Sequence, residues 1–286
     1  MKTRIISGIV ASVILIIIMQ LPPFIMGIAV FAASLVALYE FYQCVRKENY
    51  NPIRIIGFST CTVFFIYLIG SAFVGEVENT FLEDLYRTVF RQDIIYLFIY
   101  LVTVCLLLQL VFRPRRFTIK DVAVTLLGMA YIPFLLSFIF MVRLMDHGYE
   151  LSWLIIIGTF STDTFAYFIG KFFGKRKLLP EISPNKTIAG GIGGILGSIV
   201  CTILYGELYI NGFSGLYLNV LHYLALGIAC GIIAQLGDWA ASAIKRNVGI
   251  KDFGHIMPGH GGLLDRIDSL LFVAPTVYFY IKFIIF

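Results

Sequence analysis

Long apolar stretches alternate with short polar connections along the whole chain. Nine stretches predict helices, and each approaches the ~20 residues that a bilayer crossing needs. Their approximate cores are residues 5–21, 24–45, 53–75, 94–112, 119–142, 151–172, 188–206, 219–244 and 269–286. No connection is long enough for a separate soluble domain, so residues 1–286 are expected to form a single integral-membrane domain.

Composition leads to the same fold class. Of the 286 residues, 59% are hydrophobic and 14% are charged, and the mean hydropathy is +0.89. A soluble domain usually carries about 25% charged residues. The pattern therefore predicts an all-α polytopic membrane protein. The first stretch could imitate a signal peptide, but no small-residue cleavage site precedes Pro22-Pro23, which favours a retained helix.

Two residue classes argue against other functions. The five cysteines are scattered through apolar stretches without metal-ligand spacing, so neither a disulfide framework nor a zinc site is predicted. The 26 Phe and 16 Tyr residues are typical of lipid-facing positions and interfacial belts rather than of base-stacking platforms. We expect no nucleic-acid partner.

Basic residues are distributed unevenly between the two sides of the predicted helices. If the N-terminus is inside, 18 of the 22 Lys and Arg residues fall on the inner side. The positive-inside rule then places the N-terminus in the cytoplasm and, with nine crossings, the C-terminus outside. We expect a multi-pass protein of the bacterial inner membrane whose polar site faces the cytoplasm.

The most polar and glycine-rich passage lies between the last two apolar stretches. It reads SAIKRNVGIKDFGHIMPGHGGLLDRIDS, residues 242–269, and contains four cations, three carboxylates and two histidines. Such a density of charge beside membrane-length stretches is costly unless it holds something charged. Glycines let the backbone approach phosphate oxygens closely, and cations neutralise those oxygens. The passage predicts a phosphoryl-handling site at a membrane surface.

A second polar passage, residues 161–194, begins inside the sixth stretch. Asp163 lies on a small, polar helical face, which favours packing toward other helices. Further on, Ser183, Lys186 and Thr187 precede a helix N-terminus, where free N–H groups favour phosphate. The alternative is that Ser183 and Thr187 cap the helix and that Lys186 only sets the topology.

The seventh stretch is rich in glycine. Gly190 and Gly194, and likewise Gly193 and Gly197, are four residues apart, the spacing of closely packed membrane helices. This small-residue stripe explains most of these glycines and permits a homodimer without requiring one. A dinucleotide-binding fingerprint is rejected, because the glycines do not follow a strand in the required order.

Carboxylates in or beside the last two stretches are candidates for a metal site. Asp238 lies inside the eighth stretch, where an ionisable residue indicates function unless it pairs internally with Lys245 or Arg246. Asp265 and Asp268 are three residues apart at the start of the last helix and could project together. Carboxylates, waters and substrate phosphates are the usual ligands of Mg²⁺. We predict Mg²⁺ at these three acids and leave a second cation open.

These residues resemble the phosphatidate cytidylyltransferase family, also called CDP-diacylglycerol synthases. The family pattern S-x-x-K-R-x4-K-D-x-G-x2-[LIF]-P-x-H-G-G-x-x-D-R-x-D matches in register at Ser242, Lys245, Arg246, Lys251, Asp252, Gly254, Pro258, His260, Gly261, Gly262, Asp265, Arg266 and Asp268. The upstream elements D-T-x-A-Y-x-x-G and S-P-x-K-T match at Asp163, Thr164, Ala166, Tyr167, Gly170, Ser183, Pro184, Lys186 and Thr187. Met257 departs mildly from the pattern, and Ala189 replaces a frequent Glu or Gln.

The resemblance implies the reaction CTP + phosphatidate → CDP-diacylglycerol + pyrophosphate, with Mg²⁺, CTP and a membrane lipid as ligands. It implies that residues 151–286 form the catalytic helices and cytoplasmic loops, and residues 1–150 a lipid-facing scaffold. The implied catalytic residues are Asp238, Asp265, Asp268 and Lys245. The implied substrate-binding residues are Ser183, Lys186, Thr187, Lys245, Arg246, Lys251, His260, Gly261, Gly262 and Arg266, with Asp163 and Asp252 as further candidates.

Two other functions remain in view. A related CTP-dependent lipid enzyme, such as a polyprenol kinase or an ether-lipid CDP synthase, would differ in its acceptor or in the phosphorus attacked. An ion-coupled transporter could use Asp163 and Asp238 as midplane ligands. The chain shows no internal repeat, and its polar residues gather in the second half, which disfavours transport.

Overall fold

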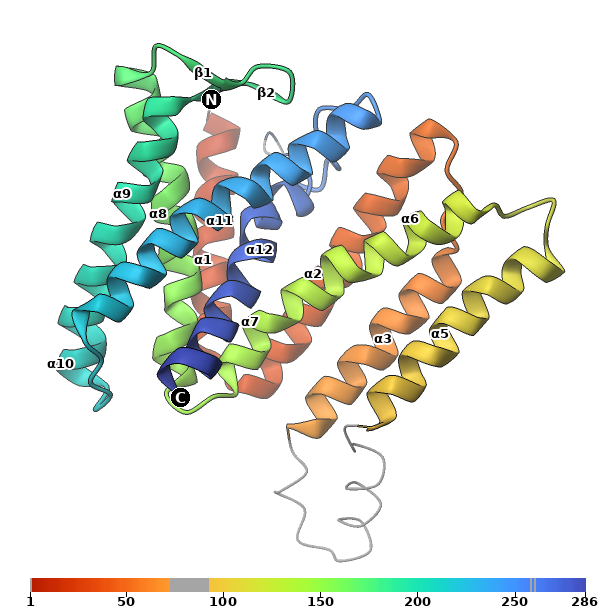
Figure 1. Ribbon diagram of the computed structural model, residues 1–286, viewed down its shortest axis with the longest axis horizontal. Coiled ribbons are helices and arrows are strands. Elements are labelled where there is room, and N and C mark those ends of the chain that lie inside the picture. Colours follow the sequence, from red (N-terminus) through yellow and green to blue (C-terminus); the bar gives the residue numbers. More distant parts are fainter. Residues whose placement is uncertain (1, 73–92, 258, 260) are drawn as a thin grey trace, which may run out of the picture. The chain divides into compact units, whose positions relative to one another are not determined.

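A computed structural model describes residues 2–72, 93–257, 259 and 261–286 (Figure 1). The described residues are mostly helical. The elements are α1 Lys2–Gln20, α2 Pro23–Val45, the 3₁₀ turn η1 Arg46–Glu48, α3 Arg54–Ser71, α5 Asp93–Phe112, α6 Ile119–Met129, the π-helical turn η2 Ala130–Phe134, α7 Leu135–Arg143, α8 Gly148–Phe173, β1 Lys177–Leu179, β2 Ser183–Thr187, α9 Ile188–Tyr205, the π-helical turn η3 Gly206–Ile210, α10 Asn211–Phe213, α11 Val220–Asn247, α12 Leu264–Tyr280 and the π-helical turn η4 Ile281–Ile285.

The fold class predicted from hydropathy is confirmed. In the described part of the chain, eight helices are long and apolar enough to cross a bilayer. The first predicted stretch also forms a helix, α1, although its apolar part Ser7–Gln20 is shorter than the other eight. The structure is that of an all-α polytopic membrane protein. Which terminus lies on which side stays a prediction.

The chain divides into two compact units. One consists of Pro22–Ser137, and the other combines Met1–Leu21 with Phe138–Phe286. The expected single domain, with a boundary between scaffold and catalytic parts at residue 150, stays a prediction.

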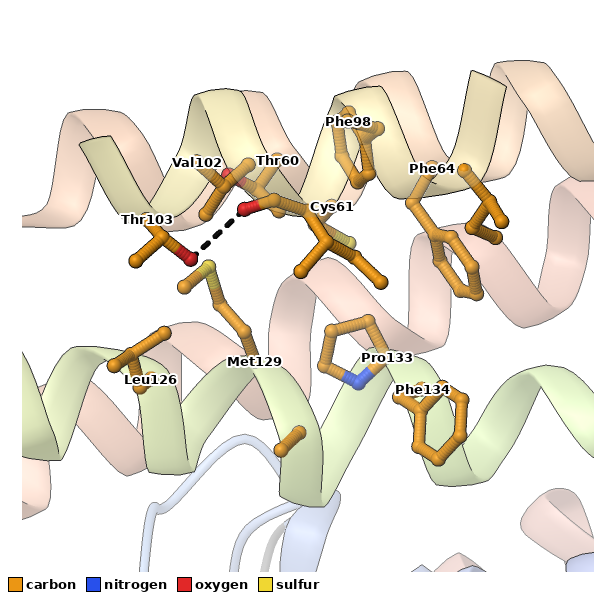
Figure 2. A pocket seen from close by; sticks show the side chains of 13 residues that line it. Thr60, Cys61, Phe64, Phe98, Val102, Thr103, Leu126, Met129, Pro133 and Phe134 are labelled. Carbon is orange, nitrogen blue, oxygen red and sulfur yellow. Dashed lines mark hydrogen bonds between the residues drawn. The ribbon is translucent and has the colours of Figure 1, made fainter. Parts of the chain in front are cut away.

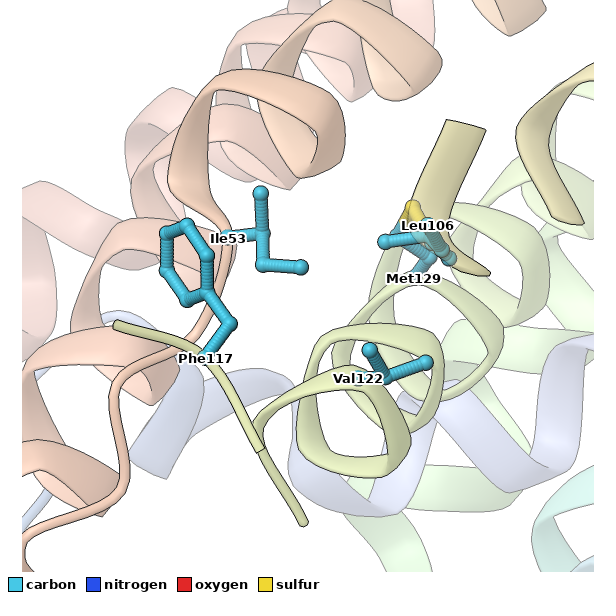
Figure 3. Close-up of a cluster of buried hydrophobic side chains, with 5 residues drawn as sticks. All are labelled: Ile53, Leu106, Phe117, Val122 and Met129. Atoms are coloured by element: carbon cyan, nitrogen blue, oxygen red, sulfur yellow. The ribbon is translucent and has the colours of Figure 1, made fainter. Parts of the chain in front are cut away.

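The unit Pro22–Ser137 is built around a buried tyrosine. The Tyr42 hydroxyl donates a hydrogen bond to the Thr125 carbonyl at 3.1 Å, which joins α2 to α6. Gly57 and Gly128 make room for the ring, because a Cβ at either position would lie less than 3 Å from Tyr42 atoms. At the helix ends, an apolar cluster of Ile53, Leu106, Phe117, Val122 and Met129 closes the packing (Figure 3).

The predicted helix 119–142 is interrupted in the structure. A π-helical turn, Ala130–Phe134, separates α6 from α7 and contains Pro133. Proline lacks an N–H group and its ring displaces the preceding turn, so the regular hydrogen-bond ladder cannot continue. Pro133 and Phe134 also line an apolar cavity of about 260 Å³ between α3, α5 and α6 (Figure 2).

The second unit is organised by the contact between α8 and α9. Cβ atoms built on Gly193, Gly194 and Gly197 would lie 2.3–3.2 Å from atoms of Thr162, Phe165, Ala166 and Ile169 on α8. The glycine stripe therefore allows two helices of the same chain to approach closely, as small residues do in membranes. A homodimer would need a different surface from the one these glycines occupy.

A short β-hairpin lies at one end of α8 and α9 (Figure 1). The sequence predicted a loop here, but β1 pairs antiparallel with β2, with Lys177 opposite Thr187 and Leu179 opposite Ser183. The Thr187 hydroxyl oxygen accepts a hydrogen bond from the Gly190 N–H at 3.1 Å. The capping interpretation of Thr187 is thus confirmed. The hairpin therefore sets the direction in which the Lys186 side chain points.

We predict that Gly197→Ala destabilises the protein although alanine favours helices by up to ~1 kcal/mol over glycine. The new Cβ would lie 2.3 Å from Phe165 Cγ, and overpacking of this kind typically costs about 1–3 kcal/mol. Thermal unfolding in detergent should show a lower midpoint. Gly212→Ala is the matched control, because its Cβ would have its nearest neighbour at 3.9 Å, and its midpoint should not fall. Equal midpoints for the two variants would contradict the packing argument.

Candidate active site

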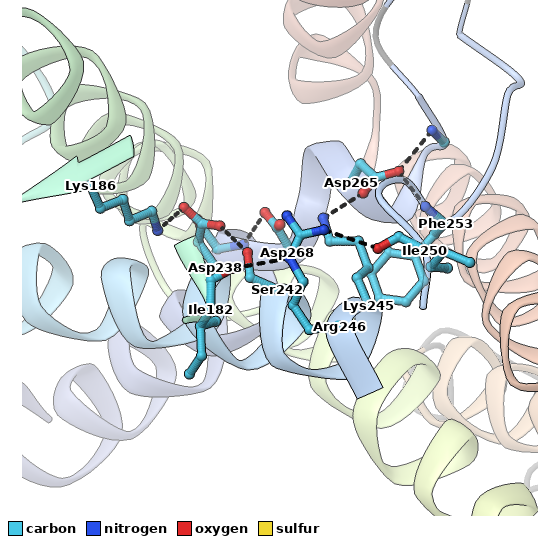
Figure 4. A network of polar contacts seen from close by, with 12 residues as sticks. Ile182, Lys186, Asp238, Ser242, Lys245, Arg246, Ile250, Phe253, Asp265 and Asp268 are labelled. Atoms are coloured by element: carbon cyan, nitrogen blue, oxygen red, sulfur yellow. Dashed lines mark hydrogen bonds and ion pairs between the residues drawn. The ribbon is translucent and has the colours of Figure 1, made fainter. Parts of the chain in front are cut away.

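The carboxylate of Asp265 joins three separate segments at the start of α12. It accepts hydrogen bonds from Lys245 Nζ at 2.7 Å, from the Phe253 N–H at 2.8 Å and from the Gly262 N–H at 3.0 Å (Figure 4). The Asp265 side chain is 3% exposed and that of Lys245 is 12% exposed. Asp265 therefore holds the loop between α11 and α12 at Phe253 and Gly262, and ties α12 to α11 through Lys245.

Asp238 has a different environment. Its carboxylate pairs with the Lys186 ammonium group from β2 and accepts a hydrogen bond from Ser242 Oγ at 3.3 Å (Figure 4). The Lys186 and Asp238 side chains are 26% and 29% exposed, so the pair is reachable from outside the protein. Lys186 Nζ also lies 5.7 Å from the centre of the Trp239 ring. The alternative pairing of Asp238 with Lys245 or Arg246 is not seen in the described residues.

Asp268 lies close to Asp238 where α11 packs against α12. Gly237 permits this approach, since a Cβ there would be 2.8 Å from the Asp268 carbonyl oxygen. Asp268 is 8% exposed, and one of its carboxylate oxygens accepts a hydrogen bond from the Ser269 N–H at 2.8 Å. Figure 4 shows the Asp238 and Asp268 side chains next to each other, with Asp265 in a separate group.

Asp163 of α8 is the third member of this acidic group. It lies close enough to Asp238, Lys186 and Arg266 for their charges to interact, and Asp268 is within the same range of Asp238 and Asp163. The neighbouring acids are therefore Asp163, Asp238 and Asp268, whereas the sequence grouped Asp265 with the last two. The difference arises because Asp265 turns toward the N–H groups of Phe253 and Gly262, and the second of these bonds resembles the backward bond that an acid in a first helical turn makes.

The donor chemistry of this site suits magnesium. Mg²⁺ is usually bound by one or two carboxylates, with waters and substrate phosphates completing the shell. Asp238 and Asp268 can provide two such carboxylates. Among the described residues, no three His, Cys, Asp or Glu side chains converge closely enough to hold one ion. The convergence of Asp238, Asp265 and Asp268 on a single cation is thus not seen in this structure.

A polar cavity of about 440 Å³ lies beside the Asp265 anchor. Its lining consists of Lys251, Asp252, His255, Met257, Gly259, Gly261 and Arg266. Gly259 and Gly261 have φ angles of 79° and 86°, a left-handed conformation that side chains rarely adopt. The Met257 N–H donates to the Gly261 carbonyl at 2.9 Å, which closes the turn between them. Two cations and a histidine outnumber the single carboxylate, Asp252, so the cavity can accommodate an anionic group.

His255 is a site residue to which the sequence assigned no role. It stands at a variable position of the family pattern, so neither motif nor spacing singled it out, and only the folded loop brings it to Lys251 and Arg266. His260, predicted to bind substrate, lies outside the described residues. So does Pro258.

The remaining predicted residues have structural partners. The Arg246 guanidinium donates to the Ile182 and Ile250 carbonyls, both at 3.3 Å, and so links the hairpin to the loop. Gly262 donates its N–H to Asp265, and Ser183 is half-buried at the start of β2. Substrate-binding roles for Ser183, Thr187, Arg246 and Gly262 stay predictions.

Comparison with known proteins places the chain in a family. A sequence model of the cytidylyltransferase family matches residues 2–284. The phosphatidate cytidylyltransferase of Bacillus subtilis is 34% identical over 98% of this chain and 97% of that protein. The enzyme of the same name from Staphylococcus haemolyticus is 34% identical over 97% of each chain. That from Thermotoga maritima is 42% identical over 57% of this chain and 60% of that protein. With a match along nearly its whole length, this chain belongs to the cytidylyltransferase family.

Proposed function

We propose that this protein transfers the cytidylyl group of CTP to phosphatidate and releases pyrophosphate. The observation that carries the proposal is the near full-length similarity to phosphatidate cytidylyltransferases, 34% identity over 98% of the chain. The arrangement of the site supports it, since the family's acids and cations gather where α8, α11, α12 and the hairpin meet. The protein is then a membrane-embedded nucleotidyltransferase that produces CDP-diacylglycerol for phospholipid synthesis.

The reaction needs positioning more than acid–base chemistry. A phosphate oxygen of phosphatidate attacks the α-phosphorus of CTP, a new O–P bond forms, and the bond to the β-phosphate oxygen breaks. The nucleophile is already anionic near neutral pH, so no strong general base is required. The main barrier is the mutual repulsion of two polyanions, which cations and a preorganised backbone reduce.

Each part of the site has a role in this scheme. Lys251, His255 and Arg266 bind phosphate groups of CTP in the polar cavity, whose glycine turn allows close backbone approach. Lys186 leaves its ion pair with Asp238 and binds the phosphate of the lipid. The free-energy cost of breaking this pair is low, because both side chains are partly exposed to solvent. Asp238 and Asp268 would hold Mg²⁺, which supplies charge neutralisation at the phosphates. Asp265 keeps Lys245 and the loop in position.

We further propose that the site faces the cytoplasm of a bacterial inner membrane. The uneven distribution of Lys and Arg supports an internal N-terminus, and the relatives compared above are bacterial proteins. CTP then enters from the cytoplasm and phosphatidate from the membrane. No nucleic acid takes part, and a homodimer would use a surface other than the α8–α9 contact.

The test is a label-transfer assay with purified protein, phosphatidate and Mg²⁺. Label from [α-³²P]CTP should appear in a lipid, and label from [γ-³²P]CTP should appear in pyrophosphate. Lipid labelled from the γ-position would instead identify a lipid kinase, and an ether lipid preferred over phosphatidate would identify the ether-lipid enzyme. Chelation by EDTA should abolish product and added Mg²⁺ should restore it. Ion flux without either product would indicate a transporter.

We predict that Asp268→Asn and Asp265→Asn fail in different ways. Asp268→Asn should lower kcat at least 100-fold with an unfolding midpoint close to that of the wild type, because it removes charge from the acidic group. Asp265→Asn should lower the midpoint as well, since a nearly buried Lys245 loses its counter-ion, a defect that typically costs about 3–5 kcal/mol. Wild-type turnover in Asp268→Asn would show that this carboxylate is not essential. An unchanged midpoint in Asp265→Asn would contradict its anchoring role.

We predict that His255→Ala raises KM for CTP about tenfold and leaves KM for phosphatidate unchanged. His255 lines the cavity assigned to the nucleotide phosphates, and losing one neutral or charged hydrogen bond there costs about 1–2 kcal/mol. His222→Ala on α11 is the matched control and should leave both KM values unchanged. The His222 Nδ1 atom lies 3.2 Å from the Tyr280 hydroxyl oxygen, and His222 does not line this cavity. A shift in the lipid KM alone would assign the cavity to phosphatidate instead.

A further inference from the structure

A group of exposed cations surrounds the end of α8, outside the site described above. We call Lys171, Lys175, Arg176 and Lys177 the basic collar; all four are exposed. The apolar span of α8 runs from Gly148 to Phe173, so Lys171 lies in its last turn and the other three cations directly follow its end. The rings of Phe172 and Phe173 are 71% and 72% exposed at the same level. Exposed rings flanked by cations are typical of the headgroup boundary.

Exposed cations alone do not make a lipid site. The connection between α5 and α6 also carries four exposed cations, Arg113, Arg115, Arg116 and Lys120, and they need no role beyond topology. What distinguishes the collar is its covalent and hydrogen-bonded continuity with the hairpin that carries Lys186.

Three contacts hold the collar to the candidate site. Lys177 pairs with Thr187, the neighbour of Lys186 on β2. The Arg176 carbonyl accepts a hydrogen bond from the Ile188 N–H at 3.1 Å, at the start of α9. Gly174 packs on Thr187 so closely that a Cβ would lie 2.5 Å from its hydroxyl oxygen. Lys177 of the collar therefore lies opposite Thr187, and the next residue along β2 is Lys186, which contacts Asp238.

We propose that the basic collar binds the phosphomonoester headgroup of phosphatidate in the membrane and passes it to Lys186. This inference rests on the proposed function. A phosphomonoester carries about −1.5 to −2 charges near neutral pH, whereas a phosphodiester lipid carries one. A concentrated group of Lys and Arg favours the more highly charged headgroup. Phe172 and Phe173 are exposed next to these cations, so in a bilayer the rings can contact acyl chains while the collar contacts the headgroup.

The collar acts on substrate capture and not on the chemical step. In full-length protein reconstituted with phosphatidate at varied mole fraction, the triple variant Lys175→Gln, Arg176→Gln, Lys177→Gln should raise the KM for phosphatidate about tenfold or more. Its kcat should stay within about twofold of the wild type, and its KM for CTP should not change. The matched control Arg113→Gln, Arg115→Gln, Lys120→Gln removes the same charge from exposed positions and should leave all three constants unchanged.

A binding measurement that does not depend on turnover separates this inference from the proposed function. Detergent-solubilised wild type should bind vesicles containing phosphatidate more tightly than vesicles containing phosphatidylglycerol at equal surface charge, and the triple variant should lose that preference. Inorganic phosphate carries a similar charge, so it should displace the lipid only in large excess, because a headgroup is held at the membrane by its acyl chains. Displacement at a concentration equal to that of the lipid would assign the collar to free phosphate and overturn the proposal.

Other outcomes also decide the question. Equal KM shifts in both triple variants would mean that only general membrane charge matters, and the collar proposal would fail. A loss of kcat without a KM shift would place these cations in the chemistry and likewise overturn it. If the wild type forms no product but still prefers vesicles that contain phosphatidate, the proposed function is refuted and the lipid-binding role of the collar is supported.

Discussion

The arrangement of the site depends on one carboxylate. Asp265 accepts one hydrogen bond from an ammonium group and two from backbone N–H groups, while its side chain is almost fully buried. Hydrogen bonds to a charged group are worth about 1.5–3 kcal/mol each, so together they determine where the loop between α11 and α12 runs. Gly261 passes so close to this carboxylate that a Cβ on Gly261 would lie 2.9 Å from Asp265 Oδ2. The polar cavity exists because the loop is held in this way.

The two ion pairs of the site differ in a manner that suits different tasks. The Lys245–Asp265 pair is 12% and 3% exposed, and separating it would leave a nearly buried charge unpaired. The Lys186–Asp238 pair is 26% and 29% exposed, so each charge can be hydrated when the pair separates. The first pair can therefore maintain structure while the second exchanges partners with an anionic substrate. Burial, rather than charge, separates the anchoring cation from the binding one.

Hydropathy predicted the fold well because a helix must have a minimum apolar length to cross a bilayer, and eight of the apolar stretches form helices of 18 to 28 residues. The site was predicted less completely. Spacing alone suggested that Asp265 and Asp268 would project together, but Asp265 instead accepts hydrogen bonds from Lys245 and from two backbone N–H groups of the preceding loop. Backbone N–H groups are the same in every residue except proline, so the sequence does not show which of them will bind a given carboxylate. For the same reason the sequence did not reveal the hairpin, nor that His255 reaches the cavity, since both depend on how the loops close.

Glycine packing explains how a polar site remains ordered at a membrane surface. Lipid offers no hydrophobic drive for one helix to prefer another, so close van der Waals contact must hold α8 against α9. At the hairpin end, a Cβ on Gly190 would lie 2.7 Å from the Ala166 carbonyl, and one on Gly170 would lie 3.1 Å from Thr187 Oγ1. This contact seats Thr187 as the cap of α9 and thereby orients its neighbour Lys186 toward Asp238. Small residues at the α8–α9 contact thus control the direction of the Lys186 side chain.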